Sequence, residues 1–134
     1  MSPNRYAVWF GRALWLGILV NLSFAIPALF TPGAFVGMLG LSEHLPETGI
    51  WLRNTGMLLV VLSGIHALVA ADPLGALPFA RWVVAGRLIA ALFWAWLPTR
   101  LGLPGVIWWF FATDLTLGSL CGYLLWRAPV LGGN

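Results

Sequence analysis

Four ionisable side chains, Arg12, His66, Arg87 and Asp114, lie inside stretches of the sequence that are otherwise apolar. On helices that rise ~1.5 Å per residue, the first three lie about 8 to 10 Å from the same boundary of their stretches, and Asp114 lies about 18 Å from it. Ionisable groups at membrane depth usually face the protein interior and pair with one another. Because an arginine side chain reaches across much of that difference in depth, we expect Asp114 to pair with an arginine of another helix, with Arg87 preferred.

This group of side chains has two interpretations. An internal salt bridge could fix the register of the helices while Arg12 extends toward the lipid headgroups. Alternatively, Arg12, His66, Arg87 and Asp114 together could form a site for an anionic headgroup, a quinone or a proton. A structural ion pair and a binding site both need the charges to lie close together, so the sequence does not decide between these two interpretations.

A second polar group is expected toward the opposite side of the membrane, formed by Asn21, Arg53 and Asn54. Asn21 lies on a stripe of small residues at four-residue spacing, with Ala13, Gly17 and Ala25. Small residues allow helix backbones to approach closely in lipid, so this stripe predicts an inward face.

The last apolar stretch has a similar face. Gly118 and Gly122 form a G-x-x-x-G pair, and Asp114 lies one turn before them. This spacing places the carboxylate on the side of the helix that we expect to pack against its neighbours.

The sequence shows no catalytic constellation and no metal site. Its single cysteine, Cys121, excludes an internal disulfide and a C-x-x-C redox pair. His44 is expected outside the span that carries His66, so the two cannot hold one haem. Glu43 and Glu47 flank His44 in what we interpret as a solvated loop. We therefore expect no catalytic residue and no resident cofactor, with a quinone or a bound lipid as the candidate ligand.

The elements that must position these groups are four apolar stretches, at residues 6–28, 51–71, 80–97 and 105–126. Each is close to the ~20 residues that an α-helix needs to cross a ~30 Å hydrocarbon core. Backbone groups in lipid must bond within their own segment, so continuous apolar runs of this length predict helices. The predicted fold is all-α: an integral membrane four-helix bundle, connected up-down-up-down, that forms one transmembrane domain over residues 1–134.

Composition and charge agree with this fold. Of the 134 residues, 60% are hydrophobic and 8% are charged, whereas soluble domains carry about 25% charged residues. No run of basic residues suits nucleic acid, so nucleic-acid binding is not expected.

The arginines expected on one side of the membrane are Arg5, Arg12, Arg81, Arg87 and Arg127, and those on the other side are Arg53 and Arg100. By the positive-inside rule, both termini are expected in the cytoplasm and the chain in the inner membrane.

Residues 31–50 form the longest connection and are expected on the outer surface. Phe35, Met38 and Leu39 are spaced like the lipid-facing side of a short interfacial helix.

Several stretches resemble a known family. They are residues 27–41 (PALFTPGAFVGMLGL), 51–73 (WLRNTGMLLVVLSGIHALVAADP) and 86–93 (GRLIAALF), together with the region of Asp114. In these the chain resembles the small four-helix membrane proteins grouped as DoxX-like, including the BphX-like branch. The resemblance would mark Arg53, Gly56, Arg87 and Asp114, and it implies a link to quinone-dependent oxidoreductases, of which a few DoxX-type proteins are membrane subunits. No redox motif accompanies these residues here.

Two classes of function follow from these observations. The first is a non-catalytic membrane subunit, or an assembly or anchor factor, of a membrane complex such as a quinone-linked respiratory one. The alternative is a membrane protein that binds a quinone or lipid through Arg12, His66, Arg87 and Asp114, or a small transporter formed by oligomerisation. The expected partners are the lipid bilayer, other membrane-protein subunits or further copies of the chain.

Overall fold

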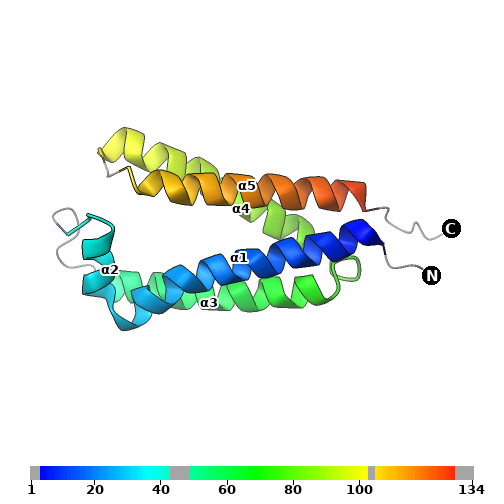
Figure 1. The fold of residues 1–134 in the computed structure, drawn as a ribbon, viewed down its shortest axis with the longest axis horizontal. Helices are drawn as coiled ribbons and strands as arrows, with labels where there is room; N and C mark the ends of the chain where they lie inside the picture. The colour runs from blue at the N-terminus through cyan, green and yellow to red at the C-terminus, as the bar shows by residue number, and fades with distance from the viewer. Residues whose placement is uncertain (1–3, 43–48, 103–104, 129–134) are drawn as a thin grey trace.

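The computed structural model describes residues 4–42, 49–102 and 105–128, and these residues fold into helices. The helices are α1 (Arg5–Phe30), α2 (Pro32–Met38), α3 (Gly49–Ala71), α4 (Leu77–Leu101) and α5 (Ile107–Arg127). Within these ranges, the four long helices run lengthwise along the molecule and the short helix α2 lies across one end (Figure 1). The described part of the chain is therefore all-α.

Local sequence sets the helix ends. Asn4 caps α1, because its side-chain oxygen accepts a hydrogen bond of 3.1 Å from the backbone N–H of Tyr6. Pro32 begins α2 at the first helical position, where proline is favoured. Gly102 ends α4 in the left-handed conformation, with a φ of 62° that only glycine adopts freely. Each of these residues fixes where a helix begins or ends before the chain turns.

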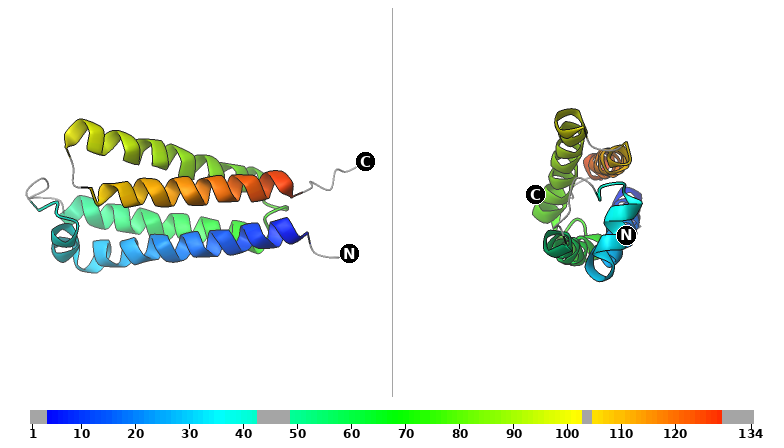
Figure 2. Two further views of the ribbon diagram at one scale, coloured as in Figure 1. Left: turned by 45° about the horizontal axis from the view of Figure 1, so that its top comes forward. Right: turned by 90° about the vertical axis from the view of Figure 1, so that its left-hand side faces the viewer.

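The long helices pack as two pairs, α1 with α3 and α4 with α5 (Figure 2). α1 also packs along α5, whereas α3 touches α4 in few places. The start of α1 lies beside the end of α5, where Arg127 donates a hydrogen bond of 3.4 Å to the Tyr6 hydroxyl. The two pairs are therefore joined mainly through α1 and α5.

Close approach of α1 and α3 depends on glycine. A Cβ atom on Gly11 would lie 2.8 Å from the carbonyl oxygen of Ala70, and one on Gly56 would lie 3.0 Å from the carbonyl oxygen of Ala25. Backbone atoms of a packed helix cannot move aside easily, so both positions need a residue without a side chain.

Two apolar clusters fill the interior, one toward each end. The first contains Phe10, Ala13, Leu14, Val69, Ala80, Val83, Cys121 and Leu124. The second contains Ala28, Phe35, Val36, Leu39, Leu41 and Ile107. The buried polar side chains Asn21, Ser63, His66 and Arg87 belong to neither cluster. Along the helices, these residues fall between the two clusters, so a polar layer separates them.

The helix α2 differs from the sequence prediction. We expected Phe35, Met38 and Leu39 to face lipid, but Phe35 and Leu39 are only 6% and 7% exposed, while Met38 is 71% exposed. α2 packs against α1 and α3, and its inner side joins the cluster that contains Ala28 and Ile107. The prediction of a short helix is confirmed, whereas its predicted lipid-facing side is wrong because that side packs against the rest of the molecule.

Three of the described helices are long and apolar enough to cross a membrane: Arg5–Phe30, Ile50–Ala71 and Leu77–Leu101. The sequence predicted a fourth span in what is now α5. That helix has 21 residues, and it includes Asp114 with several hydroxyl-bearing residues. It is not among the three helices that are long and apolar enough to span a membrane.

Two glycine-to-alanine substitutions should change stability in opposite directions. Gly11→Ala places a Cβ against the Ala70 carbonyl and should destabilise the fold by about 1–3 kcal/mol, as overpacking typically does. Gly64→Ala on α3 meets nothing within 4 Å, and should stabilise it by about 0.4–1 kcal/mol by restricting the unfolded chain. Thermal unfolding in detergent measures both, and equal melting temperatures for the two variants would contradict the packing described.

Candidate functional site

Arg87 links three helices from the middle of the molecule. It lies on α4 and is 8% exposed. Its Nη1 donates a hydrogen bond of 2.7 Å to Oδ1 of Asp114 on α5, which is also an ion pair. Its Nη2 donates to Oδ1 of Asn21 at 3.2 Å and to the carbonyl oxygen of Gly17 at 3.3 Å, both on α1. The predicted pairing of Asp114 with Arg87 is confirmed.

Two glycines make room for this guanidinium and its helix. A Cβ on Gly17 would lie 2.8 Å from Nη2 of Arg87, and a Cβ on Gly118 would lie 3.1 Å from Cβ of Arg87. The small-residue faces expected on α1 and α5 therefore pack around Arg87. Without side chains at these positions, the charged group reaches the α1 backbone and α5 approaches α4 closely.

Arg12 does not join this group, and its predicted place there is wrong. Its side chain is exposed and its guanidinium carbon lies 4.8 Å from the centre of the Trp9 ring. Arg12 precedes Gly17 by five positions, which on a helix of 3.6 residues per turn is a rotation of about 140°. The face of α1 that meets Arg87 therefore points away from Arg12.

The predicted outer polar group is not formed. Asn21 binds Arg87 instead, while Arg53 donates from Nε to the carbonyl oxygen of Leu29 at 3.3 Å. Asn54 is exposed. Arg53 thus satisfies a carbonyl in the last turn of α1, which is a structural role, and the three residues act separately.

His66 is buried on α3, on the same side of that helix as Ser63. Neither Nδ1 of His66 nor Oγ of Ser63 has a hydrogen-bond partner among the described residues. His66 thus makes no hydrogen bond to the Arg87–Asp114 pair and does not line the pocket beside it. The structure brings together Arg87 and Asp114 of the predicted four, with Asn21 added.

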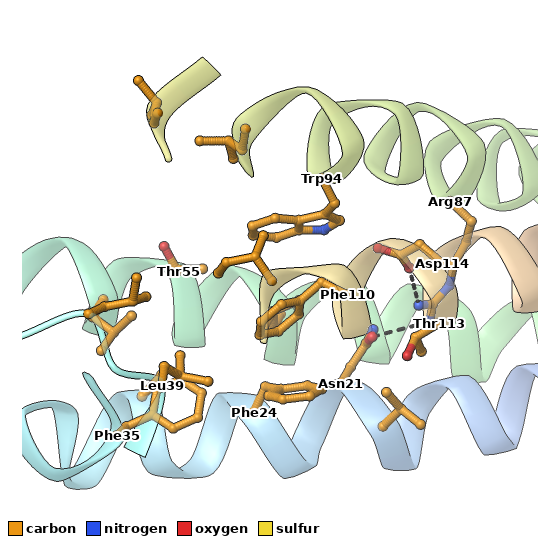
Figure 3. Close-up of a pocket in the computed structure, with 18 residues that line it drawn as sticks. Asn21, Phe24, Phe35, Leu39, Thr55, Arg87, Trp94, Phe110, Thr113 and Asp114 are labelled. Carbon is orange, nitrogen blue, oxygen red and sulfur yellow. Dashed lines mark hydrogen bonds and ion pairs between the residues drawn. The ribbon is translucent and has the colours of Figure 1, made fainter. Parts of the chain in front are cut away.

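A pocket of about 570 Å³ opens beside the Arg87–Asp114 pair (Figure 3). All five helices contribute to its wall. Its polar side chains are Asn21, Thr55, Arg87, Thr113 and Asp114. Its apolar side chains are Val20, Phe24, Ala28, Phe35, Leu39, Leu41, Leu52, Leu59, Trp94, Leu97, Leu101, Ile107 and Phe110. Asn21, Arg87, Thr113 and Asp114 lie together at one end of the pocket, whereas Thr55 lies apart from them (Figure 3). The pocket therefore has a largely apolar body and a polar end, at which the ion pair lies.

Aromatic rings form one continuous wall of this pocket. The ring of Phe110 lies 4.7 Å from that of Phe24 and 4.9 Å from that of Trp94, and the planes of Trp94 and Phe110 are 27° apart. Phe35 of α2 continues the wall, 6.2 Å from Phe24. An aromatic wall of this kind offers a large apolar contact surface to a ligand.

These aromatic pocket residues were not predicted from the sequence, although their spacing carried a signal. Phe24 follows Asn21 by three positions and Phe110 precedes Asp114 by four, so each lies one turn from a polar residue on the same helix face. Trp94 follows Arg87 by seven positions, which is two turns. Aromatics repeated at helical spacing from the polar group could have indicated the pocket.

The polar end of the pocket is electrically neutral, because the charges of Arg87 and Asp114 cancel at a separation of 2.7 Å. Within the described residues, no hydrogen bond reaches Oδ2 of Asp114 or leaves the side-chain nitrogen of Asn21. These atoms can accept from and donate to a ligand. The arrangement suits binding of a neutral polar group, and the hydroxyls of Thr55 and Thr113 in the pocket wall donate to backbone carbonyls.

Metal binding finds no support in the described ranges 4–42, 49–102 and 105–128, where no three His, Cys, Asp or Glu side chains come together. Glu43, His44 and Glu47, which we interpreted as part of a solvated loop, lie outside these ranges.

Removing one partner of the ion pair should cost more than removing both. Arg87→Leu leaves the Asp114 carboxylate stranded, and breaking a buried pair in this way typically costs about 3–5 kcal/mol. The double variant with Asp114→Leu should recover much of that loss, as measured by the melting temperature in detergent. Additive losses in the two single variants, with no recovery in the double variant, would show that the pair contributes no coupling energy.

Comparison of the chain with protein-family models, with curated proteins and with solved structures finds no match to any of them. None of these comparisons supports the expected resemblance to DoxX-like proteins, so the site is interpreted from its own geometry.

Proposed function

We propose that this chain is a small integral membrane protein that binds a neutral amphipathic molecule, of the quinone or neutral-lipid class, in the pocket beside Arg87 and Asp114. The four long helices would cross the bilayer as an up-down-up-down bundle, with both termini in the cytoplasm. The observation that carries the proposal is the neutral polar end of an otherwise apolar pocket.

The surface of the molecule supports the membrane placement. On α3 and α4, large apolar side chains point outward, including Leu68 at 75% exposed and Leu92 at 72% exposed. Exposed apolar faces of this extent are costly in water and favourable in lipid.

The arginines Arg5, Arg12, Arg81 and Arg127 gather near the end where α1 and α4 begin and α5 ends, as the positive-inside rule requires of a cytoplasmic face. Retention of the chain in membranes after alkaline extraction would test this placement.

The dimensions of the pocket support ligand binding. A volume of about 570 Å³ lies within the ~300–1,000 Å³ of typical small-molecule sites, which are mostly apolar with a few placed polar groups. A protein that serves only as an anchor needs no pocket of this size. The pocket therefore favours the binding role over the anchor role that the sequence also allowed.

The charge balance selects a neutral head group. The guanidinium of Arg87 is already compensated by Asp114 at 2.7 Å and also bonds to α1. An anionic group would have to displace the carboxylate or lie beside it, where like charges repel. A carbonyl oxygen, in contrast, can accept a hydrogen bond from the Asn21 amide, and a hydroxyl can donate one to Oδ2 of Asp114, without adding charge.

A side chain that fills the pocket should abolish this binding. Thr55 lines the pocket, and Thr55→Phe should weaken binding of decylubiquinone by at least about tenfold, or ~1.4 kcal/mol. The matched control is Asn54→Phe, which adds a ring at the exposed neighbouring position and should bind as the unaltered chain does. Titration calorimetry in detergent measures both.

Equal affinity in both variants would contradict the pocket assignment. If the unaltered chain fails to bind decylubiquinone, the same titration with a long-chain prenyl alcohol decides between the two ligand classes, and absence of binding to either would reject the proposed function.

A further inference from the structure

A second groove, distinct from the pocket beside Arg87, runs between α4 and α5 near the end where α4 begins. It encloses about 470 Å³. Its lining consists of Leu77, Arg81, Val84, Ala85, Leu88, Gly122, Leu125, Trp126 and Ala128. Every lining side chain is apolar or aromatic except Arg81, so the groove has a hydrophobic bed with one positive charge at its edge.

The groove is deep at Gly122 because this residue has no side chain. A Cβ at this position would lie 3.3 Å from Cγ1 of Val84 on the opposite wall. Val84 and Leu125 are half-buried, whereas Trp126 is exposed at the rim. The groove is therefore open to the surroundings along its length and closed beneath.

The length of the groove matches one leaflet of a bilayer. Its residues on α4 extend from Leu77 to Leu88, a distance of about 16 Å at ~1.5 Å per residue. The hydrocarbon core is ~30 Å thick, so one leaflet is about half of that. A single acyl chain that enters from this end of the molecule would lie along the whole groove.

The charge at this end of the molecule is strongly positive. Arg81 is exposed at the rim and makes no ion pair within the described residues. Arg127 lies near the Tyr6 ring, 5.5 Å from its centre. The carboxylate that the structure describes at this end, Asp72, already accepts a hydrogen bond of 2.9 Å from the backbone N–H of Gly75. This one described carboxylate is outnumbered by the arginines Arg5, Arg12, Arg81 and Arg127, so this end of the molecule stays net positive.

We propose that this groove binds an anionic phospholipid, with one acyl chain between α4 and α5 and the phosphate at the guanidinium of Arg81. Guanidinium groups bind phosphate oxygens through paired, charge-assisted hydrogen bonds. Basic pockets between helices on the cytoplasmic side are typical binding places for anionic lipid headgroups. The inference rests on the membrane placement proposed above, but not on the quinone or neutral-lipid pocket.

Charge also argues against a second copy of the chain as the occupant. In a two-fold dimer within one membrane, the same surface faces itself, so Arg81 of one copy would approach Arg81 of the other. Like charges close together cost energy, whereas an anionic lipid removes that cost. The groove therefore suits a phospholipid better than it suits a self-interface.

The test is retention of phosphatidylglycerol from vesicles that contain equal amounts of phosphatidylglycerol and phosphatidylcholine. The full chain is reconstituted, released in mild detergent and examined by native mass spectrometry. We expect the unaltered chain to retain phosphatidylglycerol preferentially. Arg81→Gln should lower that preference about fivefold, the equivalent of ~1 kcal/mol per arginine near an anionic surface. Gly122→Leu should fill the groove and abolish retention.

Two control variants distinguish a loss of lipid binding in the groove from general effects of removing a charge or enlarging a helix residue. Arg53→Gln removes an arginine from the opposite end, and Gly86→Leu adds a side chain at a glycine with nothing within 4 Å. Both should retain phosphatidylglycerol as the unaltered chain does. If Gly122→Leu fails to fold, Arg81→Gln and its control still decide the outcome.

Three results would overturn the proposal: no preference in the unaltered chain, an unchanged preference in Arg81→Gln, or a dimer without bound lipid. Failure of the chain to insert into vesicles would reject the membrane placement itself. If the chain inserts into vesicles and binds decylubiquinone but shows no preference for phosphatidylglycerol, only the proposed lipid binding in the groove is rejected.

Discussion

Burial of the Arg87 guanidinium among three helices is the constraint on which the rest of the structure depends. Taking a charge out of water costs several kcal/mol unless a partner and further hydrogen bonds offset it. Asp114 provides the opposite charge, while Asn21 and the Gly17 carbonyl accept the remaining bonds. Since these groups come from α4, α5 and α1, the ion pair and its hydrogen bonds join the α4–α5 pair to α1 of the other pair. The helices α3 and α4 touch in few places.

This constraint also explains why a pocket exists. The polar layer divides the interior into two apolar clusters, and the second cluster leaves a cavity of about 570 Å³ between itself and the ion pair. Aromatic side chains line the cavity, and the neutral ion pair forms its polar end. The same side chains that hold the helices together therefore provide the groups that a ligand would contact, which means that structural and binding roles share one set of residues.

The sequence predicted the helices and the central ion pair, because both follow from composition along the chain. Asp114 is the carboxylate in the midst of an apolar stretch, and Arg87 lies at a depth from which its side chain can reach it. The depth of a residue along its helix could not show that Arg12 lies outside the site and Asn21 inside it. Whether a side chain reaches the site also depends on which side of the helix it projects from. Arg12 points about 140° away from the face that includes Gly17, whereas Asn21 lies on that face.

Other features needed tertiary information. The apolar side of α2 could pack against lipid or against protein, and the spacing of its apolar residues is the same in both cases. Phe35 is buried because α2 packs across α1 and α3. The pocket itself depends on the sparse contact between α3 and α4, which no local pattern encodes. Trp94 stacks on Phe110 in the pocket wall, an arrangement that depends on how α4 packs against α5.

The central claim, that a charged Asp114 compensates Arg87 in the interior, can be tested most directly by infrared spectroscopy. The chain has two aspartates, Asp72 and Asp114, so a sample labelled with ¹³C at the aspartate carboxyl carbon, compared with the same sample of Asp114→Asn, isolates the Asp114 signal. At neutral pH we predict the band of an ionised carboxylate, at a frequency that shifts when Arg87 is replaced by Gln. The band of a protonated carboxylic acid, unchanged by Arg87→Gln, would contradict the account.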